Sequence, residues 1–403
     1  MKAFGLVFFG IMASQAIVAV LPLLLAKILS PEEMGIIAGL TAVVGIFGGV
    51  AHLRYANVIN IADNESEALG LERASVKISF FISVLILLIL TLLDFSGLVP
   101  TLSQWRPWSY FIPAWVLTTS LYTSKTEFFV FKKNYQQYSL INVIRSVVTV
   151  LLHIPIFWVG GIFIPLMAKT LGELVPFVFF RQKSLASPTK DIEVIKKYRH
   201  YSIHDTPIYV LTLLSKNIIF FSVGSFYSLA TLGIFSLSYK IFKLPLSLVG
   251  ESMRKVLERK FKDHVDDSAR FNSLLHRSLA GILIVVFGIA LGIYYLTEPF
   301  FEYFFDERWI SASSYVIAML PAMGFHLFTT PYQSAYKVQG KMKILTRVQL
   351  IQSVLVVMAI FWGHDKGALQ MVWAYSIAWA VSFAYLPFHA ILLNGLGLRS
   401  KNA

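Results

Sequence analysis

Apolar residues in this chain form long, nearly uninterrupted stretches instead of the short patterns of a soluble protein. A stretch of about 20 apolar residues has the length at which a helix crosses the hydrocarbon core of a bilayer. We therefore expect an all-α polytopic membrane protein whose even number of spans puts both termini on one side. Twelve spans are predicted, approximately at 4–27, 33–51, 76–95, 108–128, 139–158, 162–180, 202–224, 229–249, 278–297, 311–330, 347–362 and 370–393.

Local signals mark several ends of these spans. Ser30-Pro31-Glu32-Glu33 predicts a helix start, with serine as the N-cap and a glutamate three residues later. Gly160-Gly161 predicts a tight turn on the outer side. The second span contains Gly35, Gly39, Gly45 and Gly49, and this spacing predicts close helix packing. The first apolar stretch is about twice as long as that of a signal peptide and has no small-residue cleavage pattern, so we expect it to be retained.

Composition agrees with this assignment. The chain is 56% apolar and 14% charged, whereas a soluble domain is about 25% charged, and its mean hydropathy is +0.67. The net charge of +13 would suggest a nucleic-acid partner in a soluble protein. In a membrane protein, basic loops set orientation instead. The absence of cysteine excludes disulfides and thiolate metal sites.

The 35 Lys and Arg residues divide unevenly between the two sides of the predicted membrane. With a cytoplasmic N-terminus, 29 are counted on the inner side, among them Arg54, Arg145 and Lys240, and four, including Lys27, on the outer side. Basic residues concentrate in cytoplasmic loops, so we expect both termini in the cytoplasm. Lys169 and Lys216 fall inside spans.

The spans divide into two six-helix halves. We expect an N-terminal bundle at 1–181, a cytoplasmic linker at 182–201 and a C-terminal bundle at 202–403. A second long cytoplasmic segment, 251–277, predicts an amphipathic helix that either lies at the membrane interface or extends a span.

An internal repeat supports the two halves. Trp108, Pro113-Ala114, Lys133 and Leu140-Ile141-Asn142 match Tyr315, Pro321-Ala322, Lys341 and Leu350-Ile351-Gln352 in order. The fourth and fifth spans thus resemble the tenth and eleventh. This predicts a parallel repeat with the substrate path between the halves.

The chain lacks the common enzyme motifs: a G-x-S-x-G elbow, an H-E-x-x-H pair and a phosphate-binding loop. His200 and His204 have metal-like spacing and precede Asp205, but no further ligand is evident. A membrane-embedded glycan polymerase would need a long outer loop, and the segments around 96–107 and 298–310 are too short. We therefore expect a transporter without a cofactor or a metal.

Charged residues at membrane depth are the functional candidates, because burying them costs at least a few kcal/mol each. Lys169 and Glu173, one turn apart, either neutralise each other or face a lumen. Lys216 either reaches outward to the interface or binds a ligand. Arg54 closes the short second span, and Lys240 lies in the middle of the eighth.

These positions predict more positive than negative charge along the candidate path, which suits an anionic ligand such as a diphosphate or an acidic sugar. Proton or sodium coupling would use buried carboxylates, for which Glu127, Glu173 and Asp205 are the candidates. His153 is interpreted as a packed histidine and Lys27 as an interfacial anchor.

Four stretches in succession make the chain resemble a known family. They are LLLAKILSPEEMG at 23–35; LRYANVI at 53–59 with the acidic loop to Glu72; Tyr198, Tyr201-Ser202 and Pro207, continued by LGIFSLSYK at 232–240 and Pro245; and FFDERW at 304–309 with Pro321, Pro331 and Gln339-Gly340-Lys341. In order and spacing the chain resembles, over nearly its whole length, the O-antigen and polysaccharide-unit flippases (Wzx-type). These belong to the multidrug/oligosaccharidyl-lipid/polysaccharide (MOP) exporter superfamily. Asp306 stands where the family usually has glycine, which bears on the shape of the outer loop.

The resemblance implies two six-helix bundles in a V, opening alternately to each side of the bacterial inner membrane. It implies an undecaprenyl-diphosphate-linked oligosaccharide as substrate, with a polysaccharide polymerase and a chain-length regulator as possible partners. Family cavities tend to be cationic, and Arg54 and Lys240 stand at basic positions of the family motifs. Lys169, Lys216 and Glu173 lie in no such motif.

Three other functions remain as alternatives. A drug or cation antiporter of the same superfamily would have a more acidic path. A major-facilitator transporter would have a basic-acidic motif near 57–77, where the sequence has Asp63-Asn64-Glu65-Ser66-Glu67. A membrane-embedded glycan polymerase is disfavoured by the short outer segments.

Overall fold

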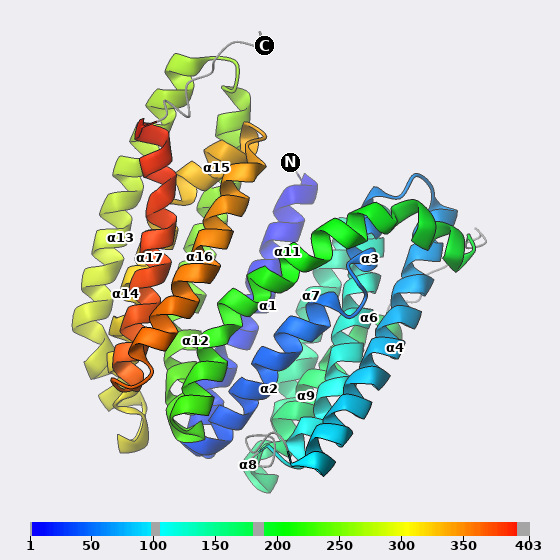
Figure 1. Cartoon of the computed structure of the whole chain (residues 1–403), viewed down its shortest axis with the longest axis vertical. Helices are drawn as coiled ribbons and strands as arrows, with labels where there is room; N and C mark the ends of the chain where they lie inside the picture. The colour runs from blue at the N-terminus through cyan, green and yellow to red at the C-terminus, as the bar shows by residue number, and fades with distance from the viewer. Residues whose placement is uncertain (1, 98–104, 180–188, 393–403) are drawn as a thin grey trace. The chain divides into compact units, whose positions relative to one another are not determined.

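The computed structural model describes residues 2–97, 105–179 and 189–392. All regular elements in this part of the chain are helices (Figure 1). Each predicted span corresponds to one helix or to two consecutive helices. Eight helical stretches of the described residues are long and apolar enough to cross a membrane. The all-α polytopic fold predicted from the hydrophobic pattern is therefore confirmed.

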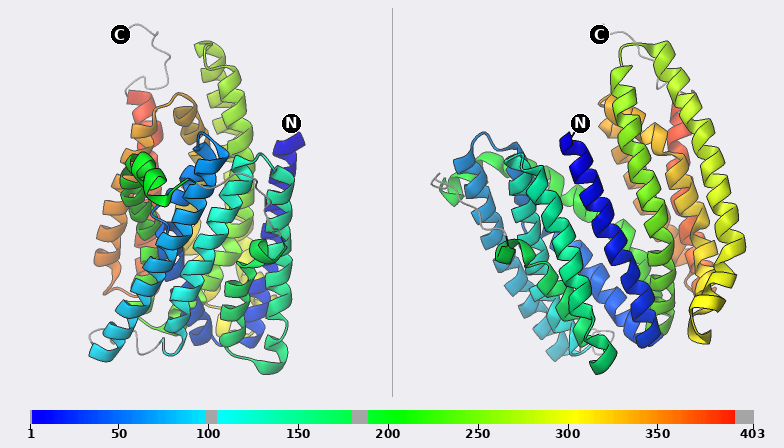
Figure 2. Two further views of the ribbon diagram at one scale, coloured as in Figure 1. Left: turned by 90° about the vertical axis from the view of Figure 1, so that its right-hand side faces the viewer. Right: turned by 180° about the vertical axis from the view of Figure 1, so that it is seen from behind.

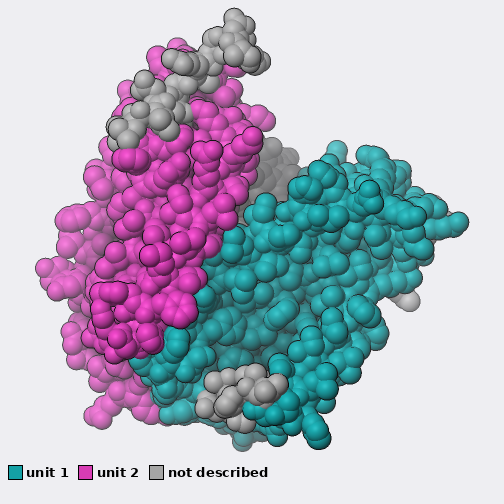
Figure 3. Space-filling model, viewed as in Figure 1, with its two compact units in different colours: residues 1–233 teal, residues 234–403 magenta. Residues whose placement is uncertain are grey.

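The chain forms two compact units, residues 1–233 and 234–403 (Figure 3). We call them unit 1 and unit 2. The division falls later than the predicted linker at 182–201. The reason is that α11 (Asp191–Phe226) packs against α2 (Pro31–Val50) and α4 (Glu65–Ser96), so it lies in unit 1.

Unit 1 is built around pairs of packed helices (Figure 2). α1 packs against α7, α4 against α6, and α2 against both α6 and α11. Its other helical elements are α1 (Lys2–Ile28), α3 (Tyr55–Val58), η1 (Ile59–Ile61), η2 (Trp108–Tyr110), α6 (Phe111–Phe131), α7 (Tyr135–His153), α8 (Ile156–Val159), α9 (Phe163–Gly172) and α10 (Val175–Phe179).

Two local predictions are confirmed in unit 1. Ser30 caps α2: the N–H of Glu33 donates to Ser30 Oγ at 3.2 Å, and the N–H of Ser30 donates to Glu33 Oε2 at 2.9 Å. This reciprocal pair satisfies two N–H groups that the first turn leaves without partners. Gly160 and Gly161 have φ values of 67° and 72°, so the turn between α8 and α9 uses the left-handed backbone that glycine permits.

Glycine lets α2 touch the first turn of α12 (Leu229–Asp263) almost backbone to backbone. A β-carbon at Gly35 would lie 1.9 Å from the carbonyl oxygen of Leu229. One at Gly233 would lie 1.8 Å from the carbonyl oxygen of Pro31. Because backbone atoms cannot move aside as a flexible side chain can, this contact tolerates no larger residue.

Serine hydroxyls join the paired helices of unit 1. Ser79 of α4 lies 2.5 Å from Ser120 of α6, and Ser14 of α1 lies 2.5 Å from Ser146 of α7, oxygen to oxygen. Small residues allow membrane helices to approach closely, and hydroxyls add hydrogen bonds between them. In each pair the two hydroxyls hydrogen-bond to each other, which lipid chains could not do for them.

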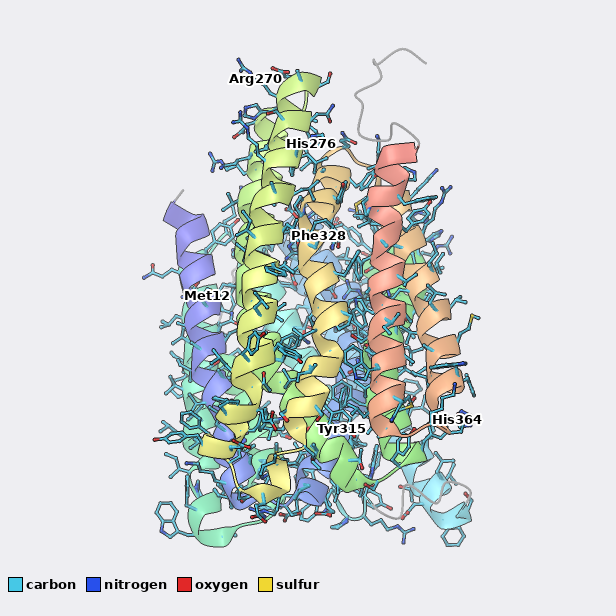
Figure 4. The ribbon with its side chains drawn as sticks, turned by 90° about the vertical axis from the view of Figure 1, so that its left-hand side faces the viewer. Met12, Arg270, His276, Tyr315, Phe328 and His364 are labelled. Carbon is cyan, nitrogen blue, oxygen red and sulfur yellow. The ribbon has the colours of Figure 1, made fainter. Side chains whose placement is uncertain are left out.

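Unit 2 places α17 (Ala368–Leu392) against α14 (Ala312–Phe328) and α16 (Met342–Gly363). Its remaining elements are the rest of α12, α13 (Ser268–Phe304), η3 (Glu307–Trp309) and α15 (Thr330–Val338). Figure 4 shows Arg270 and His276 at one end of this unit and Tyr315 and His364 toward the other. Unit 2 therefore places these two pairs of residues toward opposite ends.

The segment 251–277 is not a single amphipathic helix. α12 continues to Asp263, a short turn follows, and α13 begins at Ser268, with Asp267 accepting a hydrogen bond from the N–H of Arg270 at 3.0 Å. The rings of Phe261 and Phe271 lie 4.8 Å apart and are fully buried. The segment thus extends two spans, which was one of the two predicted roles.

The predicted repeat has a structural counterpart at two helix ends. α6 and α15 both end with a residue in the left-handed conformation, Lys133 (φ 54°) and Gly340 (φ 71°). In each case the next N–H bonds back five residues, Asn134 to Phe129 at 3.0 Å and Lys341 to Tyr336 at 2.9 Å. This is the Schellman arrangement. The caps align Lys133 with Gly340, one residue away from the predicted match with Lys341.

Asp306, where the resembled family has glycine, serves as the N-cap of η3. Its carboxylate accepts hydrogen bonds from the backbone N–H of Arg308 at 3.2 Å and from the Arg308 side chain at 2.5 Å. The side-chain hydrogen bonds hold the pKa of this carboxyl below its usual range. Asp306 therefore stabilises the turn by capping η3 with its side chain, whereas a glycine there would act through its freer backbone.

We predict that Gly233→Ala and Gly35→Ala each lower the thermal stability of the purified protein, because the new methyl group meets backbone atoms. Overpacking of this kind costs roughly 1–3 kcal/mol. Gly288→Ala on α13 is the matched control, since no atom lies within 4 Å of a β-carbon there. Unfolding in detergent measures the effect, and equal stability of all three variants would contradict the close contact.

Candidate functional site

Six of the seven predicted site residues lie in unit 1. Lys240 lies in unit 2. The six are Arg54, Glu127, Lys169, Glu173, Asp205 and Lys216.

Arg54 and Asp205 form an ion pair in unit 1. Arg54 Nε donates to Asp205 Oδ2 at 2.7 Å, and the guanidinium carbon lies 3.9 Å from the centre of the Tyr209 ring. The Arg54 side chain is 15% exposed and the Asp205 side chain 51% exposed. The structure thus joins a predicted ligand-binding cation to a predicted coupling carboxylate.

The backbone that carries Arg54 is unusual. Leu53 and Arg54 both have positive φ values, 47° and 62°, which cost roughly 1–2 kcal/mol per residue outside glycine. Ser202 of α11 donates a hydrogen bond to the carbonyl oxygen of Leu53 at 2.6 Å and helps to hold this turn. The preceding residue, His52, is fully buried, and burial lowers its pKa to about 3. His52 is therefore neutral and adds no charge beside Arg54.

Glu127, near the end of α6, has a different partner. Asn60 Nδ2 donates to Glu127 Oε2 at 2.9 Å, and Arg54 lies within electrostatic range. No ion pair involves Glu127 in the described part of the chain. Among the three predicted coupling carboxylates, it is the one held by a neutral amide.

Glu173 is paired with Arg145, which was predicted to lie on the cytoplasmic side. Arg145 Nη1 donates to Glu173 Oε1 at 3.1 Å, and its guanidinium carbon lies 4.7 Å from the centre of the Tyr122 ring. Tyr122 in turn donates to Asn142 Oδ1 at 2.7 Å. Arg145 lies in the interior of α7, within the predicted span 139–158, so counting it as a loop charge was wrong.

A sequence signal for this group was present. Tyr138, Asn142, Arg145 and Thr149 are spaced by four, three and four residues in a helix that is mostly apolar from Leu140 onward. This spacing puts them on one face. A polar stripe on a spanning helix indicates a surface directed toward other polar groups and away from lipid.

Lys169 of α9 extends the same polar region toward α2. Its Nζ donates to Thr41 Oγ1 at 3.2 Å and lies 5.0 Å from the centre of the Trp115 ring. Glu173 lies within electrostatic range of this ammonium group. The predicted proximity of Lys169 and Glu173 therefore holds, while the hydrogen bonds shown for each residue go to other helices.

These residues form one charged track through unit 1. It begins at Arg54 and Asp205, passes Glu127, Tyr138 and Tyr122, and reaches Arg145, Glu173 and Lys169; Tyr138 lies within electrostatic range of both Glu127 and Arg145. The track carries three positive and three negative side chains. It is thus balanced, whereas a positive excess was expected, because Arg145 joins the track but Lys216 and Lys240 do not belong to it.

The two remaining lysines are not among the residues of the track. Lys216 is exposed on α11. Lys240 is half-buried on α12, and the described part of unit 2 contains no ion pair to it. The rings of His200 and His204 have their centres 4.2 Å apart and are tilted by 43° to each other. Within the described residues, no group of three or more His, Asp or Glu side chains is placed to hold a metal ion.

The chemistry of the track suits a polar, hydroxyl-rich ligand. Arginine presents planar donors that match phosphate and carboxylate oxygens. Carboxylates accept hydrogen bonds from hydroxyls, and amides both accept from hydroxyls and donate to them. Tyr122, Tyr138 and Trp115 supply flat apolar faces. Such a set can hold a sugar with a negatively charged attachment.

Comparison with known proteins gives a family and a fold. The sequence model of a family described as "Polysaccharide biosynthesis protein" matches residues 24–314. No curated protein matches the chain significantly. A solved structure of "Lipid II flippase MurJ, inward closed conformation" is similar with a TM-score of 0.77 at 15% identity, covering 98% of this chain and 89% of that one.

Two further solved structures belong to the MOP superfamily. A transporter from Pyrococcus furiosus Vc1 (DSM3638) gives a TM-score of 0.63 at 13% identity and covers 99% of this chain and 97% of that one. A multidrug resistance MATE family transporter in an inward-facing conformation gives 0.65 at 14% identity, with 99% and 96% covered. At these identities the similarity establishes the fold and leaves the substrate open.

We predict that the Arg145–Glu173 pair can be separated into its structural and functional contributions. Arg145→Met alone leaves Glu173 buried without its cation and should destabilise the protein strongly, by roughly 3–5 kcal/mol. The double variant Arg145→Met/Glu173→Met should recover most of that stability, because a buried pair is often replaceable by apolar residues. Thermal unfolding measures this step.

Transport should remain lost in the stable double variant if the pair binds the ligand. Surface glycan in a complemented deletion strain is the readout. Full glycan from the double variant would show that the pair serves folding alone.

Proposed function

The chain belongs to the polysaccharide biosynthesis protein family, and we propose that it flips an undecaprenyl-diphosphate-linked oligosaccharide across the bacterial inner membrane. The substrate would be an O-antigen or related repeat unit, delivered from the cytoplasmic to the outer leaflet. The observation that carries this proposal is the charged track of unit 1, in which arginine, carboxylate, amide and aromatic side chains share one polar region at membrane depth.

The fold supports a transporter, because similar solved structures include a lipid II flippase and transporters of the MOP superfamily. In our proposal the protein opens alternately to each side of the membrane. The sugar-diphosphate head group enters the polar region while the prenyl chain stays in lipid. Desolvation of the head group is offset by Arg54, Arg145 and Lys169, whose own burial is already compensated by protein partners.

For energy coupling, Glu127 is our proposed proton or sodium carrier. Asp205 and Glu173 each already bind an arginine, at 2.7 Å and 3.1 Å, so a coupling cation would have to compete with that arginine. Glu127 is held by Asn60, whose neutral amide carries no charge that would repel a bound cation. The proposed orientation has both termini in the cytoplasm, and a polymerase and a chain-length regulator would act on the delivered unit.

A second candidate function is small-molecule or drug antiport. The observation that favours it is the balanced charge of the track, in which Glu127 has no ion pair among the described residues and could attract a cation. Multidrug transporters share the fold. The two functions differ in cells, because only the flippase leaves lipid-linked glycan on the cytoplasmic side when it is absent.

We predict that deletion of the gene leaves lipid-linked repeat units on the cytoplasmic side and removes surface glycan. Arg54→Ala and Lys240→Ala should fail to restore glycan although the protein is present in normal amount. Asp205→Asn is the control for the Arg54 ion pair, since it removes the partner and leaves the cation. Unchanged glycan and increased drug sensitivity in the deletion strain would support the antiporter instead.

We also predict that Glu127→Gln keeps the protein folded and abolishes the dependence of transport on a proton or sodium gradient, because glutamine cannot exchange a proton. Transport in vesicles with an imposed gradient is the measurement. Asn60→Ala, which leaves the carboxylate, should retain coupling. Normal gradient dependence in Glu127→Gln would rule out this residue as the carrier.

A further inference from the structure

α11 has a shallow apolar pocket on one flank. Its volume is about 640 Å³, and six of the eight residues that line it are apolar: Leu53, Ile203, Pro207, Val210, Leu211 and Leu214. From Ser202 to Leu214 the pocket follows about 18 Å of helix. It therefore has the length and the lining of a site for one hydrocarbon chain.

The packing of α11 explains why this flank is uncovered. Tyr209 and Leu213 pack closely on Gly49 of α2, at 3.0 and 3.1 Å from an ideal β-carbon there. On the other flank, Ile203 is 63% exposed and Leu214 is 42% exposed. The apolar surface thus belongs to a helix that is firmly held on its opposite side.

One end of the pocket is polar. Leu53 lines it, and the next residue, Arg54, is held at its rim by Asp205 and Tyr209. Thr206 also lines the pocket, and its hydroxyl has no hydrogen-bond partner in the described part of the chain. Pro207 lacks the N–H that would bond to the carbonyl of Ile203. Hydrogen-bonding groups therefore gather where the hydrocarbon surface begins.

Backbone strain occurs at the same place. Leu53 and Arg54 are consecutive residues in the left-handed region, and Ser202, which lines the pocket, donates to the Leu53 carbonyl. Strained residues of this kind concentrate at ligand sites, because the surrounding structure must hold them. Here the strained turn places Leu53 in the pocket and Arg54 at its charged rim.

We propose that this pocket, which we call the α11 groove, binds the first isoprene units of a polyprenyl diphosphate, with the diphosphate at Arg54 and Thr206. This rests on the proposed function and adds a tail site to it. The charged rim lies at the start of the predicted span 202–224 and the apolar part within it. A lipid in the cytoplasmic leaflet has the same order of charge and hydrocarbon.

The charge at the rim indicates which kind of lipid the α11 groove binds. A bare acyl chain would need the apolar surface alone, whereas a prenyl diphosphate uses both the apolar surface and the guanidinium. A single slot on one helix flank also suits one chain better than the two chains of a phospholipid. The anionic head group and the single chain thus both favour the prenyl lipid.

The test is photo-crosslinking of the purified full-length protein with benzoylphenylalanine at position 210. The protein is placed in phosphatidylethanolamine–phosphatidylglycerol vesicles with or without undecaprenyl diphosphate. We expect the prenyl adduct at position 210 to exceed severalfold that at position 88 of α4, a 56% exposed control. Arg54→Ala should lower the adduct roughly tenfold, the usual worth of a charge-assisted hydrogen bond.

Equal prenyl adducts at positions 210 and 88, or an adduct unaffected by Arg54→Ala, would overturn the α11 groove. A second variant tests it in cells: Val210→Trp fills the groove and should reduce surface glycan, whereas Leu88→Trp should not. Normal glycan from Val210→Trp also counts against the groove. If the deletion strain accumulates lipid-linked units while these tests fail, the flippase function stands and the tail site alone is wrong.

Discussion

A charged side chain inside a bilayer must find its partner within the protein, and the arrangement of unit 1 depends on this constraint. Water is absent from the hydrocarbon core, so each unpaired charge costs several kcal/mol. Arg54 is met by Asp205, Arg145 by Glu173 and Lys169 by Thr41 and the face of Trp115. Each pairing joins two helical segments. The contacts that offset the cost of burying these charges therefore also fix how α2, α6, α7, α9 and α11 pack.

The pairing of these charges within the protein has a consequence for ligand binding. A cation already satisfied by a protein carboxylate can bind a ligand anion only by sharing or exchanging its partner. The balanced track thus provides a polar route whose members are neutralised when no ligand is present. Arg54 shows the arrangement most clearly, because its partner Asp205 is half exposed and its turn is strained. An anionic head group could replace Asp205 there without leaving a charge unpaired.

Much of the fold followed from the sequence. The hydrophobic stretches predicted each span, the capping box of Ser30 and Glu33 and the Gly160-Gly161 turn were identified from residue type, and the family was recognised from ordered motifs. The division of the chain was harder. α11 contains both the end of the predicted linker and the seventh span, and only its packing on α2 and α4 shows that it lies in unit 1.

The sequence by itself determined which segments are apolar enough to enter a membrane and which charges enter with them, because hydrophobicity and length are properties of a segment. It did not determine which charges meet. Lys169 and Glu173 lie four residues apart, in α9 and at its C-cap, yet the hydrogen bond to Glu173 comes from Arg145, 28 residues away. Partners on different helices depend on helix rotation and packing, and the tertiary structure alone decides these.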